Sequence, residues 1–353
     1  MRVLLVGTGV QAIPPTGYGG VERTIAEYAE ALHAAGHEAV IVNEVRGGRM
    51  RDEYPFARSL PRLLRDQRCD VLHASTPVVA NRLAGLGLPF VYTTHSRHWF
   101  DREGLTQWWG YYLERRAVRR ATATIALTAR LAETIVRSVG SEVRERLRVI
   151  PIGVDTERFQ PAASERTGSV ALGVGVVAPV KRWDLAAAGL RGSGFRFRLV
   201  GPIADPQYAE AVRAAGDQVE IVGELGDDEL RGEYARADLL VHPSRVEILP
   251  GVVLQAMASG LPVLGTEVIS SIIEPTITGW CSPVGADAEQ IVTFIRDRAT
   301  ALREYPELAR TAGQRGRELA LERYQWSEVV RRHLEVYRTV VEGSISRSGT
   351  PAE

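Results

Sequence analysis

The feature that most constrains the fold is an alternation, repeated along most of the chain, between short aliphatic runs and longer amphipathic stretches. Buried parallel strands contain nearly continuous Val, Ile and Leu, and the helices that connect them are apolar on one face. The alternation therefore predicts an α/β protein whose parallel sheets are covered by helices on both faces. In the first half, strands are expected at 2–6, 38–43, 70–73, 90–94, 124–127 and 148–151.

A break in this alternation divides the chain into two domains. Residues 152–169 lose hydrophobic periodicity and gather Pro, Gly and Ser, which is typical of a linker. We expect two doubly wound, Rossmann-like domains, over 1–163 and 164–325, with ligands in the cleft where the carboxyl ends of both sheets meet. The strands of the second domain are expected at 170–174, 196–200, 220–222, 239–242 and 262–264.

Composition argues against several classes of function. The net charge is zero and neither sign forms a long run, so no nucleic-acid partner is expected. The N-terminus, MRVLLVGTG, is apolar over too few residues for a secretory or membrane segment, which predicts a cytoplasmic protein. No His, Cys or carboxylate spacing suits a metal, and Asp227 and Asp228 are better explained as a helix N-terminus.

A glycine-rich loop follows the first predicted strand. Gly17, Gly19 and Gly20 lead directly into a predicted helix. Glycines let backbone amides approach an oxygen-rich ligand, and the helix N-terminus adds partial positive charge. The loop is therefore a candidate cradle for a phosphate or a sugar, although a flexible loop without a ligand also fits the pattern.

Two cations follow the first strand of the second domain. Among 43 Lys and Arg residues, Lys181 is the only lysine, which suggests that an ammonium rather than a guanidinium is wanted at this position, with chance as the alternative explanation. Lys181 and Arg182 stand at a predicted helix start, where two fixed cations suit a diphosphate and would stabilise a leaving nucleotide. A solvated basic pair is the alternative interpretation.

A carboxylate and an amide follow a later strand of the same domain. Glu247 is presented at a strand end, and Gln255 lies one turn into the next helix. A carboxylate there can hold sugar hydroxyls, and an amide can hold ribose hydroxyls. A solvated or capping Glu is the alternative, because acids favour helix starts.

The histidines fall into three groups. His95 directly follows a predicted strand at the cleft side of the first sheet, where it can hydrogen-bond a sugar hydroxyl or stabilise developing charge. A purely structural role is the alternative, since a lone histidine is usually structural. His73 and His242 lie in or at the end of strands and are expected in the core. The surface helix positions are assigned to His33, His37 and His333.

Residues 108–120, WWGYYLERRAVRR, are aromatic at one end and basic at the other. A helix of this kind can rest on an anionic membrane surface. The basic residues form no long uninterrupted patch, however. We therefore favour a helix that packs its aromatic face on the sheet.

Taken together, the three loops resemble those of family 4 glycosyltransferases, which are retaining enzymes of the GT-B fold. The similarity covers nearly the whole chain and includes GYGGVE, PIGVDTERFQP, PVKRWD, ASGLPVLGTE and YQWSEVVRRHLEVY. It implies two Rossmann-like domains that face each other across a cleft, with a C-terminal helix at about 326–342 crossing back to the first domain. Residues 343–353 are small and polar enough to be disordered.

The resemblance also implies roles for individual residues. A UDP-, GDP- or dTDP-linked sugar would bind mainly to the second domain, without a metal or other cofactor, and a small-molecule, secondary-metabolite or glycan-precursor acceptor to the first. Glu247 would hold the donor sugar, Lys181 would contact the diphosphate, and His95 would border the reaction centre. The other donor-binding candidates are Gly19, Gly20, Arg182, Glu224, Ile248, Leu249 and Gln255, and the acceptor-binding candidates are Tyr18, Ser96 and Arg97.

The chain departs from the family pattern near these residues. Val176 replaces a usual Arg, and Gln255 replaces a usual second Glu. A neutral amide bonds a ribose diol more weakly than a carboxylate does. Ile248 and Leu249 also differ from the usual residues and would reshape the sugar pocket. A catalytically weakened glycan-binding or partner protein and an epimerase-like enzyme therefore stand as alternatives to a transferase.

Overall fold

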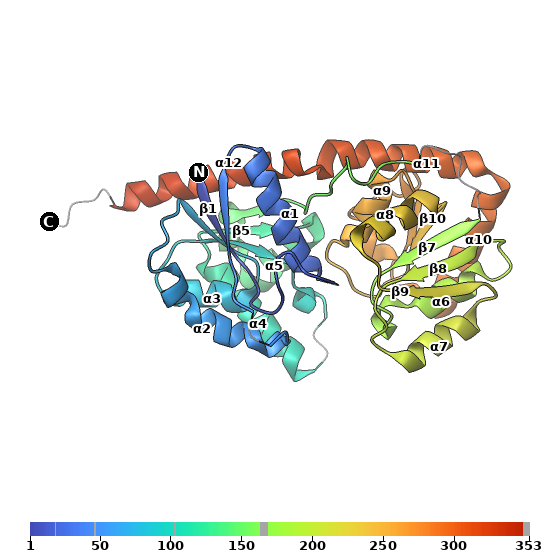
Figure 1. Cartoon of the computed structure of the whole chain (residues 1–353), viewed down its shortest axis with the longest axis horizontal. Coiled ribbons are helices and arrows are strands. Elements are labelled where there is room, and N and C mark those ends of the chain that lie inside the picture. The colour runs from blue at the N-terminus through green and yellow to red at the C-terminus, as the bar shows by residue number, and fades with distance from the viewer. Residues whose placement is uncertain (18, 46, 102–103, 163–168, 349–353) are drawn as a thin grey trace. The chain divides into compact units, whose positions relative to one another are not determined.

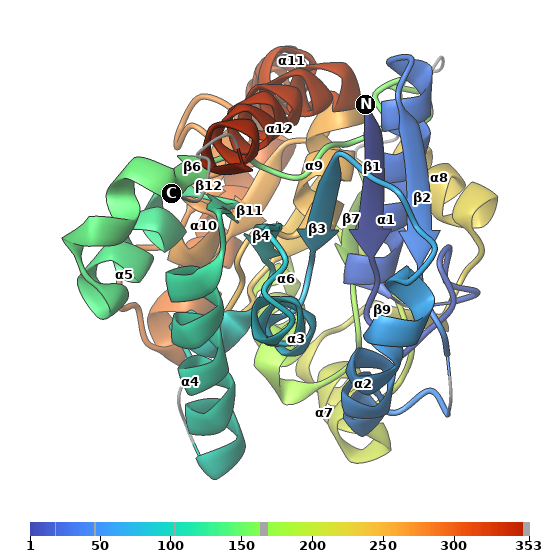
Figure 2. The same ribbon diagram turned by 90° about the vertical axis from the view of Figure 1, so that its left-hand side faces the viewer.

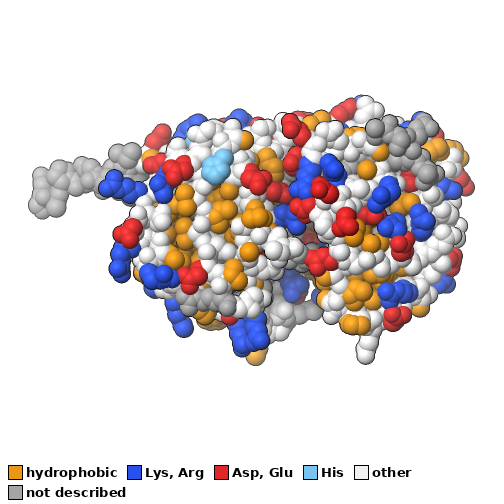
Figure 3. Space-filling view, viewed as in Figure 1, with side chains coloured by type: hydrophobic (Ala, Val, Ile, Leu, Met, Phe, Trp, Pro, Cys, Tyr) orange, Lys and Arg blue, Asp and Glu red, His pale blue; other side chains and the backbone are white. Residues whose placement is uncertain are grey.

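The computed structural model of the protein describes residues 1–17, 19–45, 47–101, 104–162 and 169–348. Contacts within the chain divide it into two compact units. Unit 1 combines Met1–Ile152 with Trp326–Glu353, and unit 2 is Gly153–Gln325. Each unit contains a parallel sheet flanked by helices (Figure 1). On the face shown in Figure 3, acidic and basic side chains are interspersed over both units.

The sheet of unit 1 has six strands in the order β2-β1-β3-β4-β5-β6. Every residue of β3, β4 and β5 is buried, because helices cover both faces of the sheet. The strand order changes direction between β1 and β3, a switch point of the kind at which open α/β sheets bind ligands. The strands are β1 (Arg2–Val6), β2 (Glu38–Val42), β3 (Val71–Ala74), β4 (Val91–Thr94), β5 (Ala123–Ala126) and β6 (Leu147–Val149).

The helices of unit 1 lie on both sides of this sheet, and Figure 1 draws α12 above the strands and α2 and α3 below them. Thr76 and Thr128 start α3 and α5 by accepting hydrogen bonds from backbone N–H groups in the first turn. A shared apolar core joins α1 and α12 to one face of the sheet. The helices are α1 (Gly20–Ala34), α2 (Glu53–Leu64), α3 (Pro77–Gly85), α4 (Leu105–Arg120), α5 (Ala129–Val139) and α12 (Trp326–Ser348).

The sheet of unit 2 also has six strands, in the order β12-β11-β10-β7-β8-β9, with its switch point between β7 and β10. The short strand β12 was not expected from the sequence. A Cβ at Gly279 would lie 2.5 Å from the carbonyl oxygen of Val263, so this close strand approach needs glycine. The strands are β7 (Val170–Val174), β8 (Arg196–Val200), β9 (Val219–Gly223), β10 (Leu239–His242), β11 (Val263–Gly265) and β12 (Gly279–Cys281).

The helices of unit 2 enclose a core built around Trp183 and Phe197. Asp227 and Asp228 open α8, as expected from the sequence, where negative charge suits the helix dipole. The helices are α6 (Trp183–Leu190), α7 (Pro206–Ala215), α8 (Asp227–Arg236), α9 (Gly251–Ala258), α10 (Ala288–Glu304) and α11 (Pro306–Leu319).

Two boundaries differ from those placed by sequence. The segment from Gly153 packs with unit 2 rather than ending the first domain, because Arg317 Nη1 donates to the carbonyls of Thr156 and Phe159 at 2.8 and 2.7 Å. At the other end, α12 continues to Ser348, past the expected end at 342. Residues 349–353 of the expected tail lie outside the described residues.

One helix position was assigned wrongly. His333 was expected at the surface, but it is 6% exposed and lies against Tyr28, His73 and Tyr337 in unit 1. Hydrophobic periodicity shows which face of a helix is buried, and His333 lies on the buried face of α12 beside Val329 and Val330.

Candidate functional site

Three polar side chains converge at the switch point of unit 2. Lys181 ends a short 3-10 helix after β7, His242 ends β10, and Glu247 lies in the loop after β10. The Lys181 Nζ donates to Glu247 Oε1 at 2.5 Å, and His242 Nε2 lies 3.2 Å from the same oxygen. Because β7 and β10 are neighbours, their following loops meet although 66 residues separate Lys181 from Glu247. We refer to Lys181, His242 and Glu247 as the charged triplet.

The environment keeps the central carboxylate of the triplet ionised. Burial alone would raise the pKa of Glu247, but the hydrogen bond from His242 and the Lys181 ammonium outweigh it and lower the pKa to about 2. Burial lowers the pKa of His242, more than the neighbouring carboxylate raises it. A neutral His242 must therefore carry its proton on Nε2 to donate to Glu247.

The backbone around Lys181 is unusually close-packed. A Cβ added to Gly201 would lie 2.1 Å from the Gly175 carbonyl oxygen, so the loops after β7 and β8 touch through glycine backbone. Trp183 is fully buried beneath Lys181 and donates from Nε1 to the Val176 carbonyl at 2.9 Å. This packing restrains the segment that carries the lysine.

Arg182 has a left-handed backbone, with φ 55° and ψ 39°. This conformation is unfavourable for a residue with a Cβ, by about 1 kcal/mol. Its partly buried side chain forms no hydrogen bond or ion pair with any residue that the structure describes. The guanidinium is thus held next to Lys181 in sequence with its donors uncommitted.

Gln255 lies on α9, near the start of the helix that follows the charged triplet. Its Oε1 accepts a hydrogen bond from the Tyr234 hydroxyl at 2.9 Å. Its Nε2 makes no hydrogen bond within the described part of the chain, so the side chain offers a ligand N–H donors rather than an acceptor. The usual Glu would offer acceptors instead.

The other candidates of unit 2 differ in accessibility. Ile248 and Leu249, which directly follow Glu247, are buried, at 8% and 9% exposure. Glu224, just beyond β9, is exposed.

In unit 1, the glycine-rich loop encloses a buried carboxylate. Gly19 precedes α1 and Gly20 begins it, with open space where a Cβ at Gly20 would point. Glu22, in the first turn, accepts a hydrogen bond from the Thr8 hydroxyl at 2.7 Å and is 7% exposed. The helix N-terminus therefore already has an internal negative group beside it.

His95 follows β4 and is partly buried. Burial, with a smaller contribution from His333, lowers its pKa to about 4, so the imidazole is neutral at physiological pH. Ser96 caps the next 3-10 helix by accepting from the His98 N–H at 3.1 Å, and Arg97 is exposed. Tyr18 lies outside the described residues.

The structure thus brings Lys181 and Glu247 into direct contact, whereas Gly19, Gly20, His95, Ser96 and Arg97 belong to unit 1. Sequence reasoning missed two hydrogen-bonding residues, Tyr234 and Glu22. It placed His242 in the core but did not predict its hydrogen bond with Glu247. A signal existed for His242, because it precedes Glu247 by five residues at a strand end.

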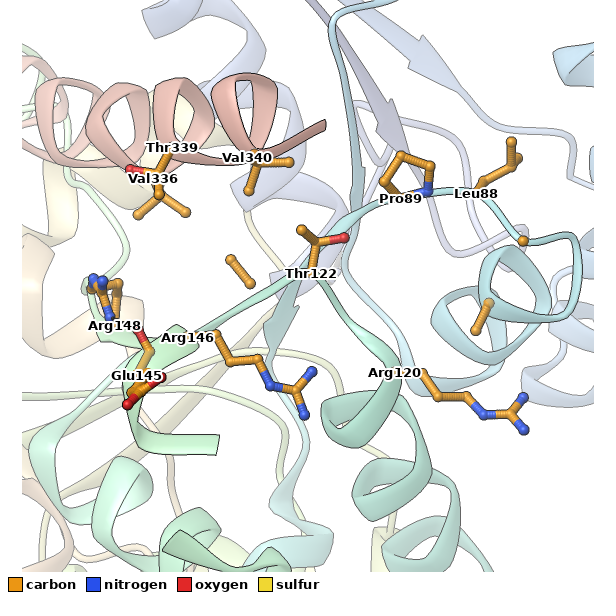
Figure 4. A pocket seen from close by; sticks show the side chains of 14 residues that line it. Leu88, Pro89, Arg120, Thr122, Glu145, Arg146, Arg148, Val336, Thr339 and Val340 are labelled. Carbon is orange, nitrogen blue, oxygen red and sulfur yellow. Dashed lines mark hydrogen bonds between the residues drawn. The ribbon is translucent and has the colours of Figure 1, made fainter. Parts of the chain in front are cut away.

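A hollow of about 840 Å³ lies elsewhere on unit 1 (Figure 4). It borders the amino ends of β5 and β6 and the last turns of α12, so it is at the opposite sheet edge from the switch point. Arg146, which lines it, donates to the Arg119 and Ala121 carbonyls at the end of α4. None of the sequence-predicted site residues lines this hollow.

Among the residues that the structure describes, no three His, Cys, Asp or Glu side chains are grouped so that they can hold a metal ion. Likewise, none of the helices within them is long and apolar enough to cross a membrane.

Comparisons with known proteins match both units. Residues 18–158 match the family described as Glycosyltransferase Family 4, and residues 175–297 match Glycosyl transferases group 1. The chain is 29% identical over 311 residues to α-maltose-1-phosphate synthase of Mycobacterium tuberculosis, covering 76% of this chain and 79% of that protein. It is 30% identical over 243 residues to 2-deoxystreptamine N-acetyl-D-glucosaminyltransferase of Streptomyces fradiae, covering 60% and 57%.

Solved structures show the same fold. Sucrose-phosphate synthase from Thermosynechococcus elongatus superimposes with a TM-score of 0.82 at 20% identity, covering 97% of this chain and 99% of that one. HepE of Anabaena in complex with UDP-glucose superimposes with a TM-score of 0.72 at 16% identity, covering 98% and 100%. The chain therefore has the two-domain α/β GT-B fold, as expected from the sequence.

Proposed function

The chain belongs to the family 4 glycosyltransferases, and from this premise we propose that it is a retaining, metal-independent enzyme. It transfers a sugar from a nucleotide diphosphate sugar to a hydroxyl group of a small-molecule or glycan-precursor acceptor. The observation that carries the proposal is the charged triplet at the switch point of unit 2. The proposal assigns roles to Lys181 and to Glu247, the carboxylate to which His242 is hydrogen-bonded.

Lys181 supplies the charge for the donor diphosphate. In the structure, its ammonium is neutralised by Glu247. A bound diphosphate offers stronger anionic acceptors, so on binding the ammonium of Lys181 shares its hydrogen bonds between the phosphate and Glu247. During transfer, negative charge grows on the leaving phosphate, and a fixed ammonium beside it stabilises that charge. Arg182, with its uncommitted donors, adds a second cation, which is why no metal is required.

Glu247 positions the donor sugar rather than removing a proton. A carboxylate whose pKa is lowered to about 2 is ionised and weakly basic, so it is a good hydrogen-bond acceptor for sugar hydroxyls and a poor general base. The proton of the acceptor hydroxyl passes instead to the leaving phosphate oxygen. The bond from the anomeric carbon to that oxygen breaks as the acceptor oxygen forms the new bond on the same face, which retains the configuration.

Gln255 adapts the nucleotide end of the site. Its Oε1 is occupied by Tyr234, so its Nε2 donates to a ribose hydroxyl oxygen where the usual carboxylate would accept. Neutral hydrogen bonds are weaker than charge-assisted ones, which predicts a modest donor affinity.

The named relatives support a small acceptor and a nucleotide-linked donor. One is named for making α-maltose-1-phosphate, a second for acting on 2-deoxystreptamine, and a structural neighbour was solved with UDP-glucose. A UDP-sugar is therefore the first donor to test, followed by GDP- and dTDP-sugars, with aminocyclitols and sugar phosphates as the first acceptors.

The single lysine makes a direct test possible. Protein grown with isotope-labelled lysine contains one side-chain ammonium signal, that of Lys181. Titration with UDP, GDP, dTDP and ADP and their sugars should shift this signal for one nucleotide, and the same nucleotide should raise the unfolding midpoint.

Lys181→Ala should lower acceptor-dependent release of nucleotide diphosphate by about a hundredfold or more. Proton NMR of the product should show a retained anomeric configuration.

The controls separate the alternatives. Arg191→Ala removes an exposed cation of unit 2 that pairs with Asp217 and should leave donor binding unchanged. Donor binding with nucleotide release but no acceptor product, or with an epimerised sugar, would favour the epimerase-like alternative. If no nucleotide moves the Lys181 signal and no acceptor-dependent release occurs with any donor, the proposal is wrong.

A further inference from the structure

The outer face of α4 and the start of α2 carry an exposed aromatic patch, defined as Tyr54 of α2 and Leu105, Trp108, Trp109 and Tyr112 of α4. The sequence favoured packing of these aromatic residues on the sheet, and for Trp108, Trp109 and Tyr112 that expectation is wrong: they are 54%, 55% and 51% exposed. Leu105 is 90% exposed. Only Tyr111 of the aromatic run is buried, against Trp99. Contiguous large apolar side chains on a surface usually mark an interaction site.

The helix has two faces with different tasks. At about 100° per residue, about one third of the helix circumference contains positions 105, 108, 109, 112, 116, 119 and 120. The opposite third contains the buried residues, which pack against unit 1. Figure 2 shows α4 at the periphery of this unit, extending beyond the strands. The inner face therefore anchors the helix, and the patch contributes nothing to the core.

The patch is ordered by its own contacts. The rings of Trp109 and Tyr112 stack with centroids 5.4 Å apart, and Trp109 Nε1 donates to the Tyr54 hydroxyl at 3.1 Å. These contacts join α4 to the start of α2, so the rings are held in place and lose little side-chain entropy on binding.

The same face is positively charged. Arg116, Arg119 and Arg120 are exposed in the second half of the helix. The one carboxylate of α4, Glu114, is fully buried on the inner face and accepts from the Tyr92 hydroxyl at 2.7 Å. An exposed face with three guanidinium groups and no carboxylate is complementary to an anionic surface.

We propose that this face of α4 docks on an anionic lipid surface. Trp and Tyr rings favour the boundary between headgroups and acyl chains, where an apolar ring and a polar edge are both satisfied. Leu105 enters the acyl region, and the arginines bind lipid phosphates. A single helix face of this size gives weak, reversible binding. The inference is independent of the donor and acceptor of the proposed reaction.

The test uses the full-length protein and vesicles of two compositions, phosphatidylcholine alone and phosphatidylcholine with an equal part of phosphatidylglycerol. Flotation should recover the protein with the anionic vesicles, less with the neutral ones, and less at high salt. Tryptophan emission should shift to shorter wavelength on binding, because Trp108 and Trp109 are exposed, whereas Trp99 and Trp183 are already buried.

Two double variants separate the apolar and charged contributions. Trp108→Ser with Trp109→Ser should lower the partition coefficient on anionic vesicles by on the order of tenfold. Arg116→Ser with Arg120→Ser should lower it by about 25-fold, at about fivefold for each arginine, and only on anionic vesicles. The matched control, Tyr305→Ser with Leu308→Ser, removes exposed apolar groups of unit 2 and should bind like the unaltered protein.

Other results would overturn the proposal. These are the absence of flotation with either composition, equal binding by the aromatic variant, or equal loss in the control. Sedimentation velocity tests whether a second copy of this chain binds the patch instead. If the protein self-associates and the aromatic variant is monomeric, the patch is an interface between copies of this chain. Nucleotide-diphosphate release is measured in parallel, so that loss of vesicle binding is distinguished from failure of the proposed reaction.

Discussion

Both units bury carboxyl groups near their sheets, but the pKa values of these groups are shifted in opposite directions. In unit 2, Glu247 is 16% exposed and its pKa is lowered to about 2 by His242 and Lys181, which outweigh burial. In unit 1, burial raises the pKa of Glu114 to about 7, although the Tyr92 and Thr94 hydroxyls donate to it. Burial likewise raises the pKa of Glu53 to about 7, where Thr76 lowers it and Glu22 raises it.

The difference shows what keeps a buried carboxyl ionised. Glu114 accepts from neutral hydroxyls, and these do not offset the loss of water. Glu247 accepts a hydrogen bond from His242 and has the Lys181 ammonium within hydrogen-bond distance, and together these do offset it. Unit 2 therefore contains a site that is charged before any ligand binds, whereas in unit 1 burial raises the pKa of Glu114 and of Glu53 to about 7, so both are largely protonated below neutral pH.

Removing the cation of unit 2 should have the largest effect. Lys181→Ala leaves Glu247 buried beside His242 without its ammonium, so the free energy of unfolding at neutral pH should fall by about 3 kcal/mol. Denaturant unfolding measures this. The double variant Lys181→Ala with Glu247→Ala should recover part of the loss, because no uncompensated charge remains. A double variant less stable than Lys181→Ala would show that the pair is not coupled as described.

The second test concerns the protonated carboxyl of unit 1. Since the pKa of Glu114 is raised from 4.5 to about 7 on folding, its contribution to stability is complete below pH 4.5 and is lost as the pH rises through about 7. Between pH 5 and pH 8, the free energy of unfolding of Glu114→Gln should therefore fall by about 2 kcal/mol less than that of the unaltered protein. Denaturant midpoints across this range measure it, with the exposed Glu133→Gln as control. Parallel pH profiles for Glu114→Gln and the unaltered protein would disprove the assignment.

The third test removes one hydroxyl from the buried network of unit 1. Tyr337 Oη lies 2.8 Å from the Tyr28 hydroxyl and 2.6 Å from His73 Nδ1. Tyr337→Phe leaves two buried polar groups with one partner fewer each, and should lower the free energy of unfolding by about 1 to 2 kcal/mol. Hydrogen exchange should show the loss in α12 and β3. The exposed Tyr305→Phe should change nothing, and an equal effect there would argue against a special role for the network.

The smallest effect is expected at Arg182. Glycine adopts the left-handed conformation without strain but gains more entropy in the unfolded chain. Arg182→Gly should therefore change the unfolding free energy by less than about 1 kcal/mol, while weakening donor binding several-fold through loss of the guanidinium. Denaturant unfolding measures the change in stability, and calorimetric titration with the donor found for the parent protein measures the change in affinity. Unchanged affinity would assign the diphosphate to Lys181 alone.

Much of the fold followed from local pattern. The five expected strands of unit 2 all formed, because a short aliphatic run between turn residues predicts a buried parallel strand from its own residues. The extra strand β12 was missed because Gly279–Cys281 has no such run and is defined by its pairing with β11. The loop after β7 was identified as cationic from its composition alone.

The aromatic run at 108–112 shows where pattern stops being informative. Four aromatic residues in five positions cannot share one helix face, since successive residues are rotated by about 100°. The sequence indicates that some of them are exposed, and only packing against Trp99 determines that Tyr111 is the buried one. Similarly, nothing near Gln255 in sequence indicates that Tyr234, on α8, occupies its oxygen.

By itself, the sequence determined the class of fold, the strand-end position of Glu247 and the single lysine, because these depend on composition and on periods of a few residues. Only the tertiary structure decided that the carboxylate and the ammonium meet, and that the pKa of Glu247 is lowered whereas that of Glu114 is raised. A buried group's charge state depends on the groups within a few ångströms of it. For Glu247 these are residues 5 and 66 positions away along the chain.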